Sequence, residues 1–477
     1  MAFALIFLPL VMALVAFLIR SSHWRPWLLP LTGVTHLGLT LLTLARPDLR
    51  VSAAWLVLDP VGGLVLLLLS LVFAVVSFYT VGYLRYRQER SNRIFCMCFQ
   101  ACLGTLSLVI WSNHLGLMWV AIEATALCTA PLIYFNHTPR SIEATWKYML
   151  IGSVGIALAL LGSFFLAYAS LHSGLAPSLV YSELLVSAPQ LSKPWLHAAF
   201  VLMLVGYGTK MGLAPMHTWK PDAYGEAPAA VGALLAGGVT SCAFLCILRI
   251  YHLCAAAGEG AYASRLLVFM GLLSMAVAGV LMVGQQDFKR LLAYSSVEHM
   301  GILVLGLGIG GGAVYGSLLH LFNNGLTKGI LFMAAGNIHR AYNSTTTDTV
   351  RGALRRVPVS GGLLLAGLLA ITGSPPFGPF ISEFTILCSA FDRAQFWVGG
   401  LFLLFLFIVF IGMGATILLM VQGKAPNAAP RTAYRDELLT VLPSLLLLGA
   451  VLVLGLTTPE FLNSRLLAAV HFLEATP

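Results

Sequence analysis

Apolar runs of membrane-spanning length recur about every thirty residues along this chain of 477 residues. A helix needs roughly 20 mostly apolar residues to cross the ~30 Å hydrocarbon core, whereas a strand of an outer-membrane barrel needs only about 10 alternating ones. The composition, 59% hydrophobic and 9% charged, excludes a soluble domain of this size. The sequence therefore predicts an all-α polytopic membrane protein.

Fourteen transmembrane helices are predicted from these runs. The first run has no basic segment before it and no small-residue cleavage site, so we interpret it as a span and not as a removable signal. The spans cover approximately residues 2–19, 27–45, 59–84, 94–111, 114–135, 143–170, 195–219, 229–251, 264–284, 289–309, 313–338, 359–388, 396–421 and 438–457.

The basic residues predict the orientation of these spans. In a soluble protein the net charge of +9 would suggest a nucleic-acid partner, but here the basic residues lie in short connections, so we expect none. Seventeen fall in odd-numbered connections, Lys220 among them, and seven in even-numbered connections and the tail, Arg249 among them. The positive-inside rule places the odd connections in the cytoplasm and both termini outside, in a bacterial or archaeal cytoplasmic membrane.

The eight cysteines predict no cofactor in this chain. They lie in or beside apolar runs, with no CxxC pair and no histidine at metal-ligand spacing, so we interpret them as packing residues. Neither an iron–sulfur cluster nor haem is indicated, and no nucleotide-binding loop is present in the sequence. Any transport by this chain therefore needs energy from a partner.

Two spans are interrupted by glycine and proline. The segments are GLAPMH, residues 212–217, and GSPPFG, residues 373–378, and the first follows Lys210 closely. Proline breaks a helix, and paired interruptions in two halves of a transporter indicate an inverted repeat with its site at the break. We predict two inverted five-helix units over residues 94–256 and 257–421, preceded by a three-helix segment (1–93) and followed by the last span and tail (422–477).

Eight ionisable residues remain inside the predicted spans, where each costs roughly 2.5 kcal/mol or more. Burial favours the neutral form of a lysine, and a carboxylate within ~4–6 Å favours the charged form, so a separable Lys/Glu couple is a proton switch. The predicted couple is Glu123 with Lys210, and Lys147 is a possible third member. Static pairs that only fix helix packing are the alternative. The eight residues are Glu123, Lys147, Lys210, Glu298, His299, His320, Lys328 and Glu383.

Long segments around these residues resemble the antiporter-like subunits of respiratory complex I and the membrane-bound hydrogenases, most of all the F subunits of hydrogenase-4. The segments are EATWKYMLIGSVGIALALLG from Glu143, GYGTKMGLAPMHTWKPDAYGEAPAAVGALL from Gly206, DFKRLLAYSSVEHMGIL from Asp287, LLHLFNNGLTKGILFMAAGNI from Leu318 and GSPPFGPFISEF from Gly373. The resemblance implies that Glu123, Lys210, Lys328 and Glu383 are the family's functional charges. It also implies proton pumping driven by peripheral subunits that carry Fe–S clusters and a NiFe site, beside other membrane subunits.

Two departures from the family pattern bear on this expectation. Asn324 stands where relatives commonly have a histidine, and the eighth span has no Lys or His between Val231 and Leu248. Lys147 or bound water could substitute in the relay, with His299, His320 and Lys328 carrying protons laterally. The predicted function is a proton-translocating subunit of a redox complex. The alternatives are a subunit of a multi-subunit Na⁺/H⁺ antiporter and a membrane anchor that does not pump.

Overall fold

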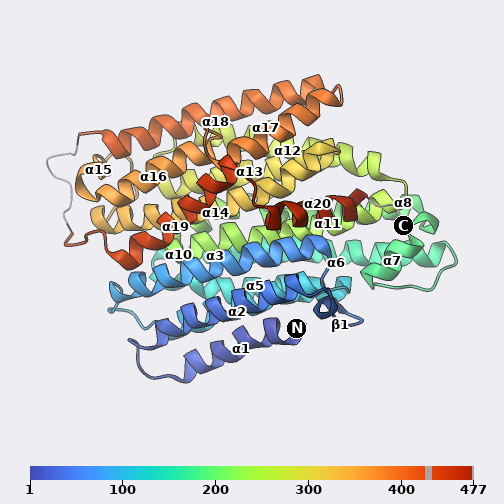
Figure 1. Cartoon of the computed structure of the whole chain (residues 1–477), viewed down its shortest axis with the longest axis horizontal. Helices are drawn as coiled ribbons and strands as arrows, with labels where there is room; N and C mark the ends of the chain where they lie inside the picture. Colours follow the sequence, from blue (N-terminus) through green and yellow to red (C-terminus); the bar gives the residue numbers. More distant parts are fainter. Residues whose placement is uncertain (425–431, 475–477) are drawn as a thin grey trace.

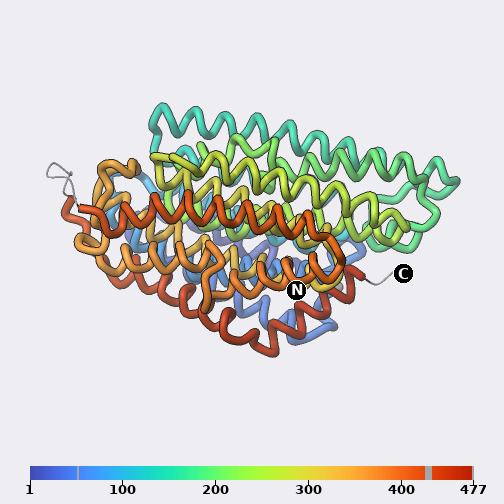
Figure 2. Tube along the Cα trace, turned by 90° about the horizontal axis from the view of Figure 1, so that it is seen from above, coloured from blue at the N-terminus to red at the C-terminus, as the bar shows by residue number. Residues whose placement is uncertain are grey.

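The computed structural model describes residues 1–424 and 432–474 as a bundle of roughly parallel helices. Helices α1 and α2 lie on the side opposite α18, and α6 forms one edge of the bundle (Figures 1 and 2). The N-terminus and the short hairpin of β1 (Val51–Ala53) and β2 (Leu56–Val57) lie toward the end opposite α15. Arg431 of the basic count and residues 475–477 of the predicted tail lie outside the described residues.

The α-helices are α1 (Ala2–Leu18), α2 (Leu28–Ala45), α3 (Pro60–Arg85), α4 (Arg93–Trp111), α5 (Leu115–Ile133), α6 (Pro139–His172), α7 (Tyr181–Ser187), α8 (Lys193–Met211), α9 (Trp219–Glu226), α10 (Ala229–Leu234), α11 (Thr240–Ala256), α12 (Gly260–Met282), α13 (Phe288–Ile309), α14 (Gly312–Tyr342), α15 (Ala353–Arg356), α16 (Pro358–Ile371), α17 (Gly378–Asp392), α18 (Phe396–Gln422), α19 (Leu438–Leu456) and α20 (Glu460–Glu474). Short 3₁₀ turns are η1 (Arg25–Trp27), η2 (Pro47–Arg50), η3 (Tyr134–Asn136) and η4 (Ala188–Gln190), and η5 (Leu235–Val239) is a π-helical turn.

Ten helical stretches in the described part are long and apolar enough to cross a membrane. The other four predicted spans coincide with α1, α8, α14 and the pair α16 and α17, which fall outside those limits. Helix α1 is only 17 residues long, and the polar residues of α14 lower its hydropathy. The chain is therefore an all-α membrane protein, and the length and composition of its helices support ten of the fourteen predicted spans.

Helix α20 was not predicted, because its apolar residues cover one face only and it is too short to span. Leu462, Leu466, Ala469 and Leu473 are buried at helical spacing, and the helix packs against α3, α11 and α14. Polar residues such as Glu460 occupy the rest of its surface. The predicted C-terminal tail is thus partly a helix that covers the bundle.

Both predicted interruptions are present. Helix α8 ends at Met211, its C-cap Gly212 has φ 86°, and the Ala214–Pro215 bond is cis. Helix α16 ends shortly before Gly373, which has φ 67°, and the Pro375–Pro376 bond is cis. A positive φ is accessible to glycine without a Cβ penalty, so glycine suits both corners. The first corner is followed by α9 and the second by α17, and the most apolar window of the stretch Ala229–Ala256 is entirely buried.

Candidate functional site

Helices α13 and α14 carry the polar residues of the bundle centre. Glu298 and His299 lie on α13, three and four residues after Ser295, so all three are near one another on the helix surface. His320 and Lys328 are eight residues apart on α14, a little over two turns, which places them along one face. Their side chains are between 0 and 1% exposed. The sequence therefore brings two polar helix faces together inside the bundle.

A chain of polar contacts connects these side chains. Lys328 Nζ donates to Ser295 Oγ at 2.7 Å and to the Leu292 carbonyl at 3.4 Å, and it interacts electrostatically with Glu298. Glu298 Oε2 lies 3.7 Å from His299 Nε2, and neither atom has a hydrogen-bond partner among the described residues. His299 Nδ1 shares a hydrogen bond of 3.0 Å with His320 Nε2. These contacts form a nearly continuous polar chain.

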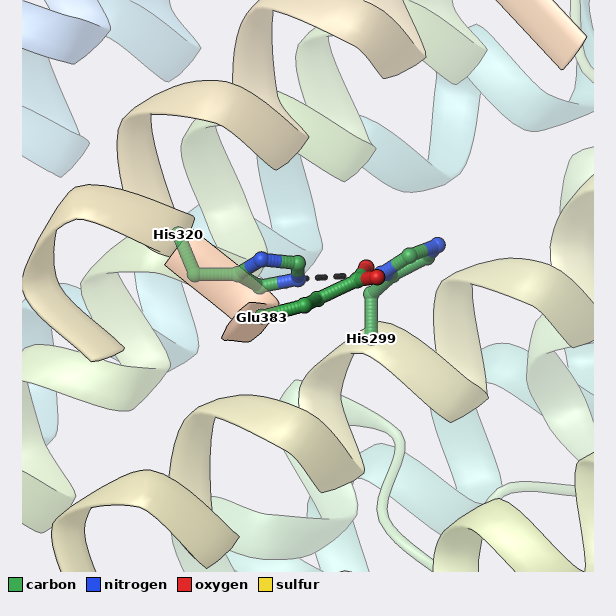
Figure 3. A group of neighbouring side chains, drawn as sticks. All are labelled: His299, His320 and Glu383. Atoms are coloured by element: carbon green, nitrogen blue, oxygen red, sulfur yellow. Dashed lines mark hydrogen bonds between the residues drawn. The ribbon is translucent and has the colours of Figure 1, made fainter. Parts of the chain in front are cut away.

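Glu383 approaches the two histidines from α17, just after the second break. Figure 3 shows its carboxylate where the two imidazole rings meet, and donor atoms of His299, His320 and Glu383 all lie within 4.8 Å of one another. The second ring nitrogen of His320, Nδ1, is 2.9 Å from Ser382 Oγ. A Cβ on Gly373 would clash with Glu383 Oε2, so the glycine corner lets the carboxylate reach this position.

Lys220 extends the polar chain toward the first break. The prediction that it lies in a cytoplasmic connection is wrong, because it lies on α9 with its side chain fully buried. Its Nζ donates to the Met211 carbonyl at 2.8 Å and to the Ser296 carbonyl at 3.3 Å, and it interacts electrostatically with Lys328. The corner at Gly212 redirects the chain, so α9 continues inside the bundle. The proline and glycine signal before it could have suggested this position.

Lys210 is buried as predicted, but it does not contact Glu123. Its Nζ donates to Tyr148 Oη at 3.0 Å and lies 4.8 Å from the centre of that ring. The Tyr148 hydroxyl is 2.6 Å from Thr129 Oγ1 on α5. Glu123 is half-buried and accepts instead from Ser153 Oγ at 2.9 Å. The expected Lys/Glu couple is therefore separated in this structure.

Lys147 is not a buried charge, contrary to our expectation. Its side chain is 44% exposed and forms ion pairs with Glu143 at 2.6 Å and Asp222 at 2.9 Å. Asp222 is also 3.0 Å from Arg290. Helix α6 begins at Pro139 and Lys147 lies on its exposed face, so the lysine reaches other surface charges. It cannot substitute for a buried histidine in the centre.

Arg249 is a second buried cation that we had assigned to a connection. Its guanidinium is 2% exposed, donates to Asp59 Oδ2 at 2.8 Å and also donates to the carbonyls of Ile110 and Ser112. Asp59 caps the N-terminus of α3, and the two carbonyls lie at the C-terminal end of α4. A cation at a helix C-terminus is favourable. Because Arg249 connects α11 to the ends of α3 and α4, we interpret it as a structural residue.

Asn324 lies beside the π-helical turn of the eighth span. Neither polar atom of its amide has a hydrogen-bond partner among the described residues, although the side chain is fully buried. The next residue, Gly325, has its carbonyl within 3.4 Å of a Cβ placed on Gly237 in the π turn. Such turns occur often at functional sites. The uncharged eighth span thus borders a buried, unsatisfied amide.

Comparison with known proteins identifies the family. Residues 112–402 match the family described as NADH:quinone oxidoreductase/Mrp antiporter, TM. The chain is 35% identical over 431 residues to a hydrogenase-4 component F homolog of Methylacidiphilum infernorum, covering 88% of this chain and 89% of that protein.

Solved structures show the same fold. A chain of the membrane-bound sulfane sulfur reductase, an archaeal respiratory membrane complex, superposes with TM-score 0.88 at 21% identity, over 100% of this chain and 98% of the other. A chain of respiratory complex I from Thermus thermophilus gives TM-score 0.79 at 25% identity, over 96% and 97%. With its buried charges and broken helices, the chain belongs to the NADH:quinone oxidoreductase/Mrp antiporter family, as an antiporter-like membrane subunit of the complex I and hydrogenase-4 group.

Proposed function

We propose that this chain is the proton-translocating membrane subunit of a hydrogenase-type or NADH dehydrogenase-like redox complex. The observation that carries the proposal is the buried polar chain from Lys220 through Lys328, Glu298 and His299 to His320. Buried ionisable groups in membrane helices are costly and typically mark a proton or ion pathway. A row of five such groups along two neighbouring helices and a break is more than helix packing requires.

Each member of the chain has a role that its contacts support. Lys328, held by Ser295 and a carbonyl, stores a proton and passes it toward Glu298. His299 takes it at Nε2, which faces Glu298, and gives it up at Nδ1 to His320. An imidazole can accept a proton at one nitrogen and release one from the other, so the pair moves charge without moving far. Glu383, beside both rings, is the acceptor at the end of the chain.

Lys210 and Glu123 form the corresponding switch of the first half. The structure has them apart, with Lys210 on Tyr148 and Glu123 on Ser153, so we propose that this is the separated state of the couple. A second conformation would bring the Glu123 carboxylate to Lys210 and raise the proton affinity of the lysine. Asn324 would complete the connection between the halves through water bound at its two unpartnered amide atoms.

The proposed topology has fourteen spans, both termini outside a bacterial or archaeal cytoplasmic membrane, and inverted repeats over residues 94–256 and 257–421. The two breaks support the repeats because each glycine corner packs against a buried ionisable side chain. At Gly212 this is Lys220, and at Gly373 it is Glu383. The driving energy would come from peripheral subunits with Fe–S clusters and a NiFe site, held by neighbouring membrane subunits.

The test compares Lys328→Met with Lys147→Met in the assembled native complex. Methionine matches the length of lysine without its charge, so assembly should survive in both variants. We expect Lys328→Met to abolish proton movement per electron pair. Lys147→Met removes only the two ion pairs of an exposed lysine and should leave proton movement unchanged. Unchanged pumping in Lys328→Met would favour the non-pumping anchor.

A Na⁺/H⁺ antiporter subunit is the second candidate, because the matched family includes Mrp antiporters. The two candidates differ in their driving force. Vesicles that contain the native complex should acidify or alkalinise under a redox drive without Na⁺ if the first proposal holds. A strict requirement for Na⁺, with ²²Na⁺ moving at the expense of a proton gradient and no redox substrate, would favour the antiporter.

A further inference from the structure

His299, His320 and Glu383 offer a donor set that binds transition metals. Two imidazoles and one carboxylate leave a fourth position open, which suits Zn²⁺ and Co²⁺. Donor atoms of the three residues already lie within 4.8 Å of one another, and no other group of this kind occurs in the part of the chain that the structure describes. Bonds of ~2.0–2.1 Å place tetrahedral donors roughly 3.3 Å apart, so side-chain movements that bring the donor atoms closer by at most about 1.5 Å complete the set.

One remaining ring nitrogen already has the hydrogen-bond partner that a metal-bound histidine needs, and the other faces a carboxylate at a longer distance. A ligating histidine normally donates its other N–H to a carboxylate, hydroxyl or carbonyl. His320 Nδ1 is 2.9 Å from Ser382 Oγ, and His299 Nε2 faces the Glu298 carboxylate at 3.7 Å. The two nitrogens left for a metal are His299 Nδ1 and His320 Nε2, which lie 3.0 Å apart and point toward Glu383 in Figure 3.

From this geometry we infer that the three side chains form a binding site for one divalent transition-metal ion, which takes the place of the proton shared between the two imidazoles. On binding, the shared N–H proton shifts to the other nitrogen of the same ring. The new N–H then donates a hydrogen bond to Ser382 from His320 or to Glu298 from His299. Both shared nitrogens then coordinate the metal. Metal binding and proton transfer between the rings exclude each other, because they use the same two lone pairs.

The binding test uses the purified full-length chain in detergent, with any affinity tag removed and Co²⁺ as a spectroscopic probe. Since the site is buried, samples are dialysed to equilibrium. We expect one tetrahedral Co²⁺ per chain, and a loss of affinity of about 10-fold or more in His320→Gln and, separately, in Glu383→Gln. Either variant suffices if the other does not fold, as judged by its elution profile.

The matched control is His36→Gln. His36 is also a fully buried histidine with both ring nitrogens hydrogen-bonded, to Ser70 and Ser107, but among the described residues it belongs to no group of three potential metal ligands. It should bind Co²⁺ like the wild-type chain. Absence of stoichiometric binding by the wild-type chain, or equal binding by His320→Gln and Glu383→Gln, would overturn the site.

A consequence for activity rests on the proposed function. If the two histidines relay protons, Zn²⁺ should inhibit proton movement in the native complex, and a chelator should reverse the inhibition. The metal site and the proton relay can be refuted independently of each other. Stoichiometric Co²⁺ binding that depends on Glu383, together with proton movement that Zn²⁺ does not inhibit, supports the metal site and argues against the relay.

Discussion

Replacing Gly212 by alanine tests whether the corner after α8 positions Lys220. The added Cβ would lie 2.5 Å from Lys220 Cδ and 3.0 Å from its Nζ, whereas carbon atoms pack best at ~3.5–4.0 Å. The lysine side chain must therefore retreat by roughly 1 Å. Such a shift is large enough to break the shorter of the two hydrogen bonds from Nζ, which joins it to the Met211 carbonyl at 2.8 Å.

The free energy of this change has two parts. A left-handed φ costs alanine about 1–2 kcal/mol. The loss of a hydrogen bond from a buried charged group adds about 1.5–3 kcal/mol. Gly174→Ala isolates the first part, because Gly174 has φ 77° and nothing within 4 Å of an added Cβ. The difference in stability between the two variants should thus be about 1.5–3 kcal/mol.

The assay measures thermal unfolding and protons moved per electron pair in the assembled complex. We expect Gly174→Ala to lower stability slightly and to pump normally, and Gly212→Ala to lower proton movement by up to ~10²-fold, as a displacement near 1 Å can do. Gly373→Ala should act in the same way through Glu383. Equal behaviour of Gly212→Ala and Gly174→Ala would refute the role that we give to Lys220.

Three further predictions concern charges elsewhere in the bundle. Lys210→Met and Glu123→Gln should each abolish coupled proton movement. Their effects on thermal stability should add within ~0.5 kcal/mol, because the two side chains have different partners. Strong non-additivity in unfolding measurements would mean that the two residues form a static pair. Asp59→Asn should lower stability by ~3–5 kcal/mol, because it leaves Arg249 buried without its counter-ion. The double change Asp59→Asn/Arg249→Met should recover part of the lost stability. Pumping per turnover should be unchanged in the protein that assembles. A cysteine at position 90 in a cysteine-free background should react with an impermeant maleimide only from the cytoplasm; labelling only from outside would reverse the proposed topology.

The family and the helical breaks follow from local sequence. Apolar runs of spanning length leave helices as the solution that satisfies every backbone group in hydrocarbon, so the fold class is set by composition and spacing. Glycine and proline act on their own dihedral angles and on the neighbouring turn, so the corners at Gly212 and Gly373 are also local properties. Helix α20 shows where local sequence is not enough. Its half-apolar pattern predicts where the helix packs only when the surface that it covers is known.

The environment of each charge was decided by the tertiary structure. Lys147, Lys210 and Lys220 all lie in or near apolar sequence, but one is on an exposed face, one is held by a tyrosine, and one enters the core after a corner. Helix periodicity tells which residues share a face, but not which face meets the bundle or where a broken helix leads. Contacts such as His299 with His320 and Glu383 join residues from three helices. Only the packing of those helices fixes such distances, because no local rule relates side chains that are tens of residues apart.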